Sequence, residues 1–346
     1  MTRSLSLPIV CVLMVSAIGM DGVTAASARD RSGTEINKAD RLARPTKQQL
    51  QRDPKLGPAT FNVGPGTPFT KPSEVVASVQ SGDTVVIAPG TYEDCVVWPK
   101  RIHGLTIEGK GAVITGPACG GKGLFVVAAS DVTIRGLTFE GAKVPDHNGA
   151  GIRSEGANLT IEDSRFINNE NGILAGRNME SSIIVQGSYF EGNGSCEGSC
   201  AHGIYIGAVK SLRVAQCTFV GQHHGHHIKS RALSTDIADS RIEDGAKGDA
   251  SYLIDIPNGG TVSIRGNRME KGPNSENSAA AIMIGEDGVK RADWHPTAGV
   301  RIENNQFASD MHVKTNFVRS FLETAVVVAN NKLTGNVTPL VSQLTR

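Results

Sequence analysis

The segment from His223 to Arg231 holds the densest group of titratable side chains in the sequence. It reads His-His-Gly-His-His-Ile-Lys-Ser-Arg, so four histidines stand directly before Lys229 and Arg231. Imidazole, ammonium and guanidinium groups that lie together can transfer protons and bind negative charge. A fold does not require such a concentration, so the segment is predicted to belong to a functional site.

Strand geometry predicts which of these side chains share a face. Residues two apart in a strand point the same way, roughly 6.5–7 Å from each other, so His227, Lys229 and Arg231 are expected to point outward. His226 is then expected to point inward or into the turn, where it would stack on His202 from the same register. Because alternation separates the histidines, we expect no metal site shared among them.

A recurring apolar phrase indicates how this segment is positioned. The pattern x-[VIL]-x-[IV]-x-x-[small or Asn]-x-[FILM] occurs eight times, and its second apolar position recurs every 23 to 38 residues. Alternation within each copy predicts strands, and repetition over this period predicts a solenoid. The copies span 132–139, 159–166, 183–190, 212–219, 235–242, 262–269, 300–307 and 326–333. Ser or Asn at the small position is expected to form a hydrogen-bonded stack at a turn.

A second predicted strand lies between successive copies of the phrase. Its inward residues are expected to be Ile152, Ile173, Ile204, Ile228, Ile254, Ile282 and Val318. The residues that follow them should point outward: Arg153, Leu174, Tyr205, Lys229, Asp255, Met283 and Arg319. Coils about 4.8 Å apart would place Tyr205, Lys229 and Asp255 in one exposed column. A Lys stacked on an Asp is also an ordinary opposite-charge pair of a strand ladder.

The start of the predicted solenoid has a characteristic form. A short amphipathic helix is predicted over Ser73–Gln80, and Gly82–Tyr92 follows as a turn, a buried strand and a second turn. Together with the repeat, this start resembles the right-handed parallel β-helix, or pectate-lyase-like, superfamily from about residue 60 to residue 340. The resemblance implies an all-β, single-stranded right-handed parallel β-helix with a short N-terminal capping helix. Folds of this class host lyases, epimerases, hydrolases and adhesins.

The predicted column suggests a reaction on an acidic polysaccharide. β-Elimination requires a base for the C5 proton, a cation for the uronate carboxylate and an acid for the leaving oxygen. Lys229 is the candidate base, Arg231 the candidate cation, and Tyr205 or His227 the candidate acid. A C5-epimerase would share the first proton abstraction. The strand Ile228–Ser230 is similar to the lysine-bearing coil of alginate- and chondroitin-type β-helix lyases, which have Arg on the next coil where this chain has Asp255.

Two other classes of function remain open from the sequence. A glycoside hydrolase would pair Asp255 with Glu243 or Asp244. A non-catalytic carbohydrate-binding or surface protein would use the same face for binding alone. In each case the partner is a polysaccharide, and the substrate-binding candidates are Arg153, Asn258, Asn274 and Asn277, the asparagines lying in loops beside the column. Glu243, Asp244 and Asp249 are either solvated turn residues or ligands of Ca²⁺, the one cofactor considered.

The sequence also predicts the domain organisation. Residues 1–25 have the form of a secretory signal, with Arg3, an apolar stretch over 7–20 and a small-residue cleavage site at 23–25. Residues 26–58 are expected to be a polar linker, and 59–346 the β-helix domain. A periplasmic or secreted protein that is monomeric is therefore expected. The net charge of +1 gives no field for nucleic acid, and no later stretch suits membrane insertion.

Cysteine spacing agrees with an oxidising compartment. Five cysteines follow the predicted signal. Cys95 with Cys119, and Cys196 with Cys200, are candidate disulfides, since exported proteins retain such bonds. Cys217 takes the place of Ser or Asn in the repeated phrase and is expected to be a buried free thiol.

Overall fold

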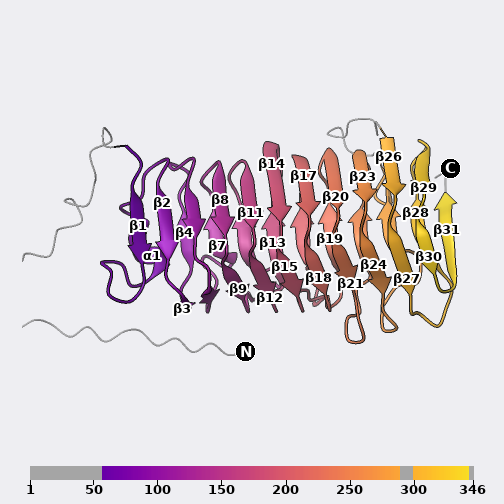
Figure 1. The fold of residues 1–346 in the computed structure, drawn as a ribbon, viewed down its shortest axis with the longest axis horizontal. Helices are drawn as coiled ribbons and strands as arrows, with labels where there is room; N and C mark the ends of the chain where they lie inside the picture. The colour runs from indigo at the N-terminus through magenta and orange to yellow at the C-terminus, as the bar shows by residue number, and fades with distance from the viewer. Residues whose placement is uncertain (1–56, 289–298, 343–346) are drawn as a thin grey trace, which may run out of the picture. The chain divides into compact units, whose positions relative to one another are not determined.

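The computed structural model describes residues 57–288 and 299–342. The predicted signal segment and all but the last two residues of the predicted linker lie outside the described residues. From residue 59 onward the chain winds as a right-handed parallel β-helix whose coils add one strand to each of three parallel sheets (Figure 1). The predicted fold class is therefore confirmed, although most coils contain three strands where the sequence indicated at least two.

The three sheets are named A, B and C. In spatial order, sheet A contains β1 (Thr60–Val63), β2 (Thr84–Ile87), β5 (Thr106–Glu108), β8 (Val132–Arg135), β11 (Leu159–Glu162), β14 (Asn178–Gln186), β17 (Val209–Ala215), β20 (Ser234–Ala238), β23 (Thr261–Arg265), β26 (Gly299–Glu303) and β29 (Val326–Ala329). Sheet B contains β3 (Gly90–Glu93), β6 (Ala112–Thr115), β9 (Thr138–Glu140), β12 (Arg165–Ile167), β15 (Tyr189–Glu191), β18 (Thr218–Val220), β21 (Arg241–Glu243), β24 (Arg268–Lys271), β27 (Gln306–Ser309) and β30 (Lys332–Thr334). Sheet C contains β4 (Val96–Trp98), β7 (Gly123–Val127), β10 (Ala150–Ser154), β13 (Asn171–Ala175), β16 (Ile204–Ile206), β19 (His226–Ser230), β22 (Tyr252–Ile256), β25 (Ile282–Ile284), β28 (Thr315–Ser320) and β31 (Val337–Ser342).

The repeated phrase crosses the corner between sheets A and B. Its first two apolar positions lie in sheet A, and its last lies in sheet B, as Ile161 and Phe166 illustrate. All three positions face the interior, where the residue at each position stacks on the residue at the same position in the next coil. The phenylalanines of four coils stack with ring centroids 4.4 to 5.4 Å apart: Phe139, Phe166, Phe190 and Phe219. The periodicity of the sequence therefore fixes the register of the whole core.

A ladder of Ser and Asn side chains turns the corner between sheets A and B. Asn267 Oδ1 accepts the backbone N–H of Ser240 at 2.9 Å, and Asn305 Oδ1 accepts the backbone N–H of Asn267 at 2.9 Å. Asn267 Nδ2 also donates to the backbone oxygen of Ile237 at 3.0 Å. These bonds satisfy backbone groups that the bend removes from the sheets, as the sequence predicted.

Asn267→Ala is expected to lower the free energy of unfolding by about 1–3 kcal/mol, because it leaves the buried N–H of Ser240 without an acceptor. Asn267→Ser should lose less, since Ser240 itself holds the equivalent place one coil earlier through its hydroxyl. Urea denaturation of both variants measures the difference. Equal losses in the two variants would contradict a role for the side-chain acceptor.

The N-terminal end differs from the prediction in two respects. The helix α1 covers only Pro72–Val75, and the chain then turns, so the predicted helix over 73–80 is too long. Its first turn is closed by Glu74, whose carboxylate accepts the backbone N–H of Thr70 and Lys71. In addition, the strand β1 precedes α1 and pairs with β2 at the edge of sheet A. The repeated phrase has no copy at β1, because Phe61 stands where the phrase requires Val, Ile or Leu.

The cysteines follow the predicted pairing. Cys95 is bonded to Cys119, and Cys196 to Cys200. Cys217 is a buried free thiol at the corner ladder, where burial raises its pKa to about 11. The disulfides are compatible with an extracellular environment.

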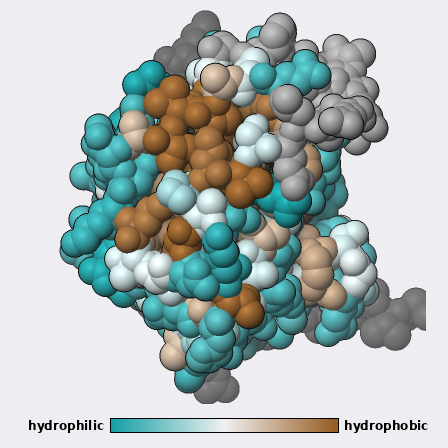
Figure 2. Space-filling view, turned by 90° about the vertical axis from the view of Figure 1, so that its right-hand side faces the viewer, coloured by the Kyte–Doolittle hydropathy of each residue, from teal (hydrophilic) through white to brown (hydrophobic). Residues whose placement is uncertain are grey.

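The C-terminal end of the stack is apolar. Val326, Val328, Leu333, Val337 and Leu340 are only partly buried against the core. Figure 2 looks onto this end and shows hydrophobic residues gathered across it. Among the described residues, therefore, no further coil covers the last one.

Candidate functional site

The register of sheet C confirms the alignment of the predicted column, but the expected exposure is wrong at Asp255, which is 3% exposed. Arg153 pairs with Leu174, Leu174 with Tyr205, Tyr205 with Lys229, and Lys229 with Asp255. The inward neighbours of these residues, such as Ile204, Ile228 and Ile254, are fully buried. Tyr205, Lys229 and Asp255 therefore lie on three consecutive coils of one face, on β16, β19 and β22.

Arg231 connects this column to the loops beside it. Its Nε donates to Tyr205 Oη at 3.4 Å, and its Nη1 lies 2.7 Å from Asp287 Oδ2 and also donates to Asn258 Oδ1. Lys229 Nζ lies 5.9 Å from the centroid of the Tyr205 ring. Two cations thus flank one phenol whose side chain remains partly exposed.

Asp255, on the next coil, forms an ion pair with Lys229. Asp255 Oδ2 lies 2.9 Å from Lys229 Nζ and 3.3 Å from His226 Nε2. Burial by itself would raise the pKa of Asp255, but the hydrogen bond from His226 and the Lys229 charge outweigh it, so the pKa is lowered. The carboxylate is therefore ionised at neutral pH. Its Oδ1 is buried, and no donor among the described residues reaches it.

His226 and His202 form a stacked pair behind the column. Their ring centroids lie 4.8 Å apart, and His226 also stacks on Tyr252 at 5.0 Å. Burial lowers the pKa of His226 more than Asp255 raises it, and burial lowers the pKa of His202 well below its usual value. His202 Nδ1 accepts the backbone N–H of His226, and His226 Nδ1 accepts the backbone N–H of Tyr252. Both rings are thus neutral with the proton on Nε2, so His226 donates to Asp255 and has no free lone pair.

The prediction that His227 faces outward is wrong. Its side chain is 1% exposed, its Nε2 lies 2.8 Å from Asp244 Oδ1, and its ring packs edge-on against Phe219. Strict alternation fails here because the chain bends where it enters sheet C. On earlier coils the equivalent position is glycine, and a Cβ built at Gly151 or Gly172 would point at core phenylalanines. The expected stacking of His202 and His226 is confirmed, but His226 is the histidine that contacts the outward column.

A groove leads to the column from the N-terminal side. It has a volume of about 460 Å³, and one wall belongs to the loop closed by the Cys196–Cys200 disulfide. Among the described residues that line it, none is acidic, and three are arginines: Arg153, Arg177 and Arg231. Tyr205 lines the same groove. Negatively charged ligands are therefore favoured along this face.

The predicted asparagines are distributed over three places. Asn258 is buried beside Arg231 and donates to the backbone oxygen of Gly288 at 3.3 Å. Asn277 Nδ2 lies 3.5 Å from Ser251 Oγ, next to Tyr252. Asn274 is exposed and donates to the backbone oxygen of Ala246, in the loop that follows sheet B. Asn258 thus joins the cluster around Arg231, and Asn274 does not.

The three acidic residues considered for Ca²⁺ have separate partners. Glu243 lies on sheet B between Arg241 and Arg268. Asp244 is buried with His227, Ser275 and the backbone N–H of Gly272. Asp249 accepts the backbone N–H of His224 at 2.6 Å. Asp255 lies on sheet C beside Lys229 and His226, whereas Glu243 lies on sheet B.

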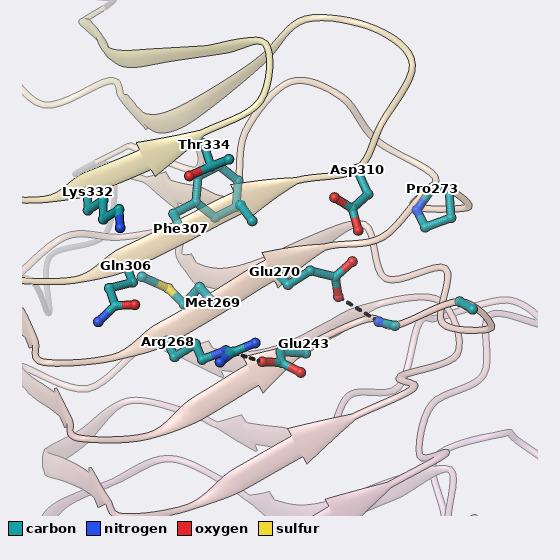
Figure 3. A pocket seen from close by; sticks show the side chains of 13 residues that line it. Glu243, Arg268, Met269, Glu270, Pro273, Gln306, Phe307, Asp310, Lys332 and Thr334 are labelled. Carbon is teal, nitrogen blue, oxygen red and sulfur yellow. Dashed lines mark hydrogen bonds and ion pairs between the residues drawn. The ribbon is translucent and has the colours of Figure 1, made fainter.

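Sheet B has a second groove that sequence reasoning missed. It has a volume of about 580 Å³ and is shown in Figure 3, where Glu270 lies between Asp310 and Arg268. Burial raises the pKa of Glu270 to about 7, with Asp244 and Asp310 adding to the effect, although its carboxylate accepts the backbone N–H of Gly245 at 2.7 Å. Only the fold brings these carboxylates from separate coils together.

Glu270→Gln is expected to raise the melting temperature at pH 8 and leave it unchanged near pH 4. The folded chain holds the Glu270 proton up to about pH 7, whereas the unfolded chain releases it near 4.5, so stability falls as pH rises through this window. Glutamine does not ionise, so the variant avoids the loss of stability that ionisation of Glu270 causes in the folded wild type. Glu243→Gln should have the opposite sign at pH 8, because Arg241 and Arg268 lower the pKa of Glu243 despite its burial. Thermal melts at both pH values measure the two changes, and a Glu270→Gln effect that is independent of pH would contradict the argument.

No helix among the described residues has the length and apolar character needed to span a membrane. Protein-family models give no match to the chain, and the curated proteins give none either. Among solved structures, the chain is similar to the A-module of the mannuronan C-5 epimerase AlgE4 from Azotobacter vinelandii, with 14% identity over 76% of this chain and 89% of that chain and a TM-score of 0.37. The A-module of AlgE6 from the same organism is 14% identical over 76% and 91%, with a TM-score of 0.24. At these identities and TM-scores the likeness carries no information on the chemistry of this chain, which has to be inferred from its own side chains.

Proposed function

We propose that this right-handed parallel β-helix is an exported enzyme that abstracts the C5 proton of a uronate in an acidic polysaccharide. The observation that supports this most directly is the position of Tyr205, flanked by Lys229 and Arg231, at the head of a groove lined by further arginines. The signal-like N-terminus and the two disulfides support export.

The roles of the side chains follow from their charges. Lys229 was the candidate base in the sequence, but its Nζ forms an ion pair with Asp255 Oδ2 at 2.9 Å. Lys229 and Arg231 are therefore assigned to the substrate carboxylate, whose neutralisation makes the C5 proton more acidic. Tyr205 is assigned to proton transfer, because its Oη faces the groove and accepts from Arg231. Asp255 and His226 act on the substrate only through Lys229.

Two outcomes of proton abstraction are consistent with this arrangement. In β-elimination, deprotonated Tyr205 takes the C5 proton, the electron pair left at C5 forms the C4–C5 double bond as the C4–O bond breaks, and Tyr205 returns the proton to the leaving oxygen, which gives an unsaturated uronate. In epimerisation, Tyr205 keeps the C5 proton, water gives a proton to C5 from the opposite face, and the chain remains intact. The arginines along the groove would bind the carboxylates of neighbouring sugars in either case.

The test is incubation of the protein with a panel of uronate polymers in D₂O. Deuterium at C5, observed by NMR, indicates proton abstraction with reprotonation, and ultraviolet absorbance of an unsaturated product indicates elimination. New reducing ends without unsaturation would instead favour a glycoside hydrolase. Binding with neither reaction would favour a non-catalytic carbohydrate-binding protein. If no polymer gives C5 exchange or an unsaturated product, the proposal fails.

A further inference from the structure

Three loops that precede consecutive strands of sheet C bring metal-binding side chains together. His224 precedes β19, Asp249 precedes β22, and Glu276 lies in the loop before β25. One ligand atom from each of the three side chains lies within 4.8 Å of the others. His223 adds a second imidazole, with Nδ1 4.0 Å from Asp249 Oδ1. The cluster therefore combines residues that are 52 positions apart in the sequence.

Backbone hydrogen bonds hold the three loops at this spacing. The backbone N–H of Glu276 donates to the oxygen of Asp249 at 3.3 Å, and that of Asp249 donates to the oxygen of Gln222 at 3.0 Å. Asp249 Oδ1 accepts the backbone N–H of His224, which leaves Oδ2 directed at the His224 ring, 3.9 Å from Nδ1. His224 Nδ1 also contacts Glu276 Oε1. The positions of the side chains thus follow from the stacking of the coils.

We propose that His224, Asp249 and Glu276 bind a divalent transition metal ion of the Zn²⁺ class, with His223 as a fourth ligand. Zn²⁺ binds imidazole nitrogen and carboxylate oxygen at about 2.0–2.2 Å in a tetrahedral arrangement, which separates the ligand atoms by roughly 3.4 Å. The separation of 3.9 Å between Asp249 Oδ2 and His224 Nδ1 is close to this value, and Asp249 Oδ1 lies 4.0 Å from His223 Nδ1. The two imidazoles favour Zn²⁺ over Ca²⁺, which prefers oxygen ligands alone.

The site is accessible to an ion from solution. The side chains of His223, His224 and Glu276 are 50%, 43% and 40% exposed. It is separate from the outward column, because none of these residues contacts Tyr205, Lys229 or Arg231 in the described structure. A bound ion would join the loops before β19, β22 and β25, and so would hold the segment around Asn277 against Ser251.

His147 provides a matched control. It also lies between two carboxylates, with Nδ1 3.4 Å from Glu170 and Nε2 3.3 Å from Glu197. Those carboxylates contact opposite sides of the ring, so they cannot share one ion with a single nitrogen. A His–carboxylate cluster whose histidine side chain is 35% exposed is thus present without the geometry for a metal site.

The experiment is calorimetric titration of untagged, chelator-treated full-length protein with ZnCl₂, followed by the visible spectrum of Co²⁺ bound at the same site. The wild type is expected to bind one equivalent and to give the Co²⁺ absorption of a tetrahedral nitrogen and oxygen site. His224→Ala and the conservative Glu276→Gln should weaken Zn²⁺ binding, the former by at least about 100-fold, since even outer-shell substitutions cost 10–100-fold. His147→Ala should bind Zn²⁺ as the wild type does.

Three results would overturn the proposal. The first is a wild type that binds no stoichiometric Zn²⁺. The second is a folded His224→Ala variant, verified by circular dichroism, with unchanged affinity. The third is an equal loss of affinity in His147→Ala, which would indicate binding to scattered surface histidines.

Discussion

Tyr205→Phe is expected to lower the turnover of a uronate polymer by about 100-fold or more, with KM changed only a few-fold. General acid–base catalysis by one positioned group contributes about 10²–10⁴-fold. The substitution removes only Oη, to which Arg231 donates at 3.4 Å, and leaves the ring beside Lys229 and His202. Initial rates of C5 exchange or of unsaturated-product formation measure the loss.

Tyr189→Phe is the matched control for this prediction. Tyr189 lies on sheet B with the guanidinium of Arg165 4.4 Å from its ring centroid, so it is another partly exposed tyrosine beside an arginine. Its activity should equal that of the wild type. Full activity of Tyr205→Phe, or an equal loss in Tyr189→Phe, would remove Tyr205 from the proposed mechanism.

Phe190→Ala is expected to destabilise the protein by about 3–5 kcal/mol. The ring is 2% exposed and lies between Phe166 and Phe219, at centroid distances of 4.7 and 4.4 Å. The strands on either side are held in register by the coils, so they cannot close the cavity without disturbing the corner ladder. Urea denaturation measures the free energy of unfolding.

Phe321→Ala serves as the comparison, because Phe321 is only partly buried and packs on a small satellite cluster with Arg319 5.2 Å from its ring. The free energy of unfolding should fall clearly less in Phe321→Ala than in Phe190→Ala. A Phe190→Ala variant that loses no more than Phe321→Ala would show that the stack of aromatic rings does not stabilise the coils. Because each coil contacts mainly its neighbours, the unfolding of Phe190→Ala should also become less cooperative.

Much of the fold could be predicted because a solenoid repeats one local pattern. Alternation and spacing predicted that Ile152, Ile173 and Ile204 align inside and Arg153, Leu174 and Tyr205 align outside; the strand register confirms both alignments, and the three isoleucines are fully buried, although Leu174 is buried as well. In a parallel ladder, neighbouring coils align like positions, so the sequence period is also the spatial period. The stacking of Asn267 on Asn305 was predictable for the same reason.

The prediction failed at the corners, where period two no longer applies. His226 and His227 exchanged their expected places because the chain bends as it enters β19, which turns His227 to the core and brings His226 to Asp255. The helix α1 ends at Val75, and a turn follows it before β2. Neither bend has a periodic signal in the sequence.

The sequence by itself thus determined the coils, their inward and outward residues, and the presence of Tyr205, Lys229 and Asp255 on one face, because these follow from repeated local alternation. Only the tertiary structure decided which charged side chains lie together and which loops come into contact. Asp255 forms an ion pair with Lys229, Glu270 lies near the carboxylates of Asp244 and Asp310, and His224 lies close to Asp249 and Glu276. These depend on burial and on loops of unequal length, whose ends come together only when the coils stack.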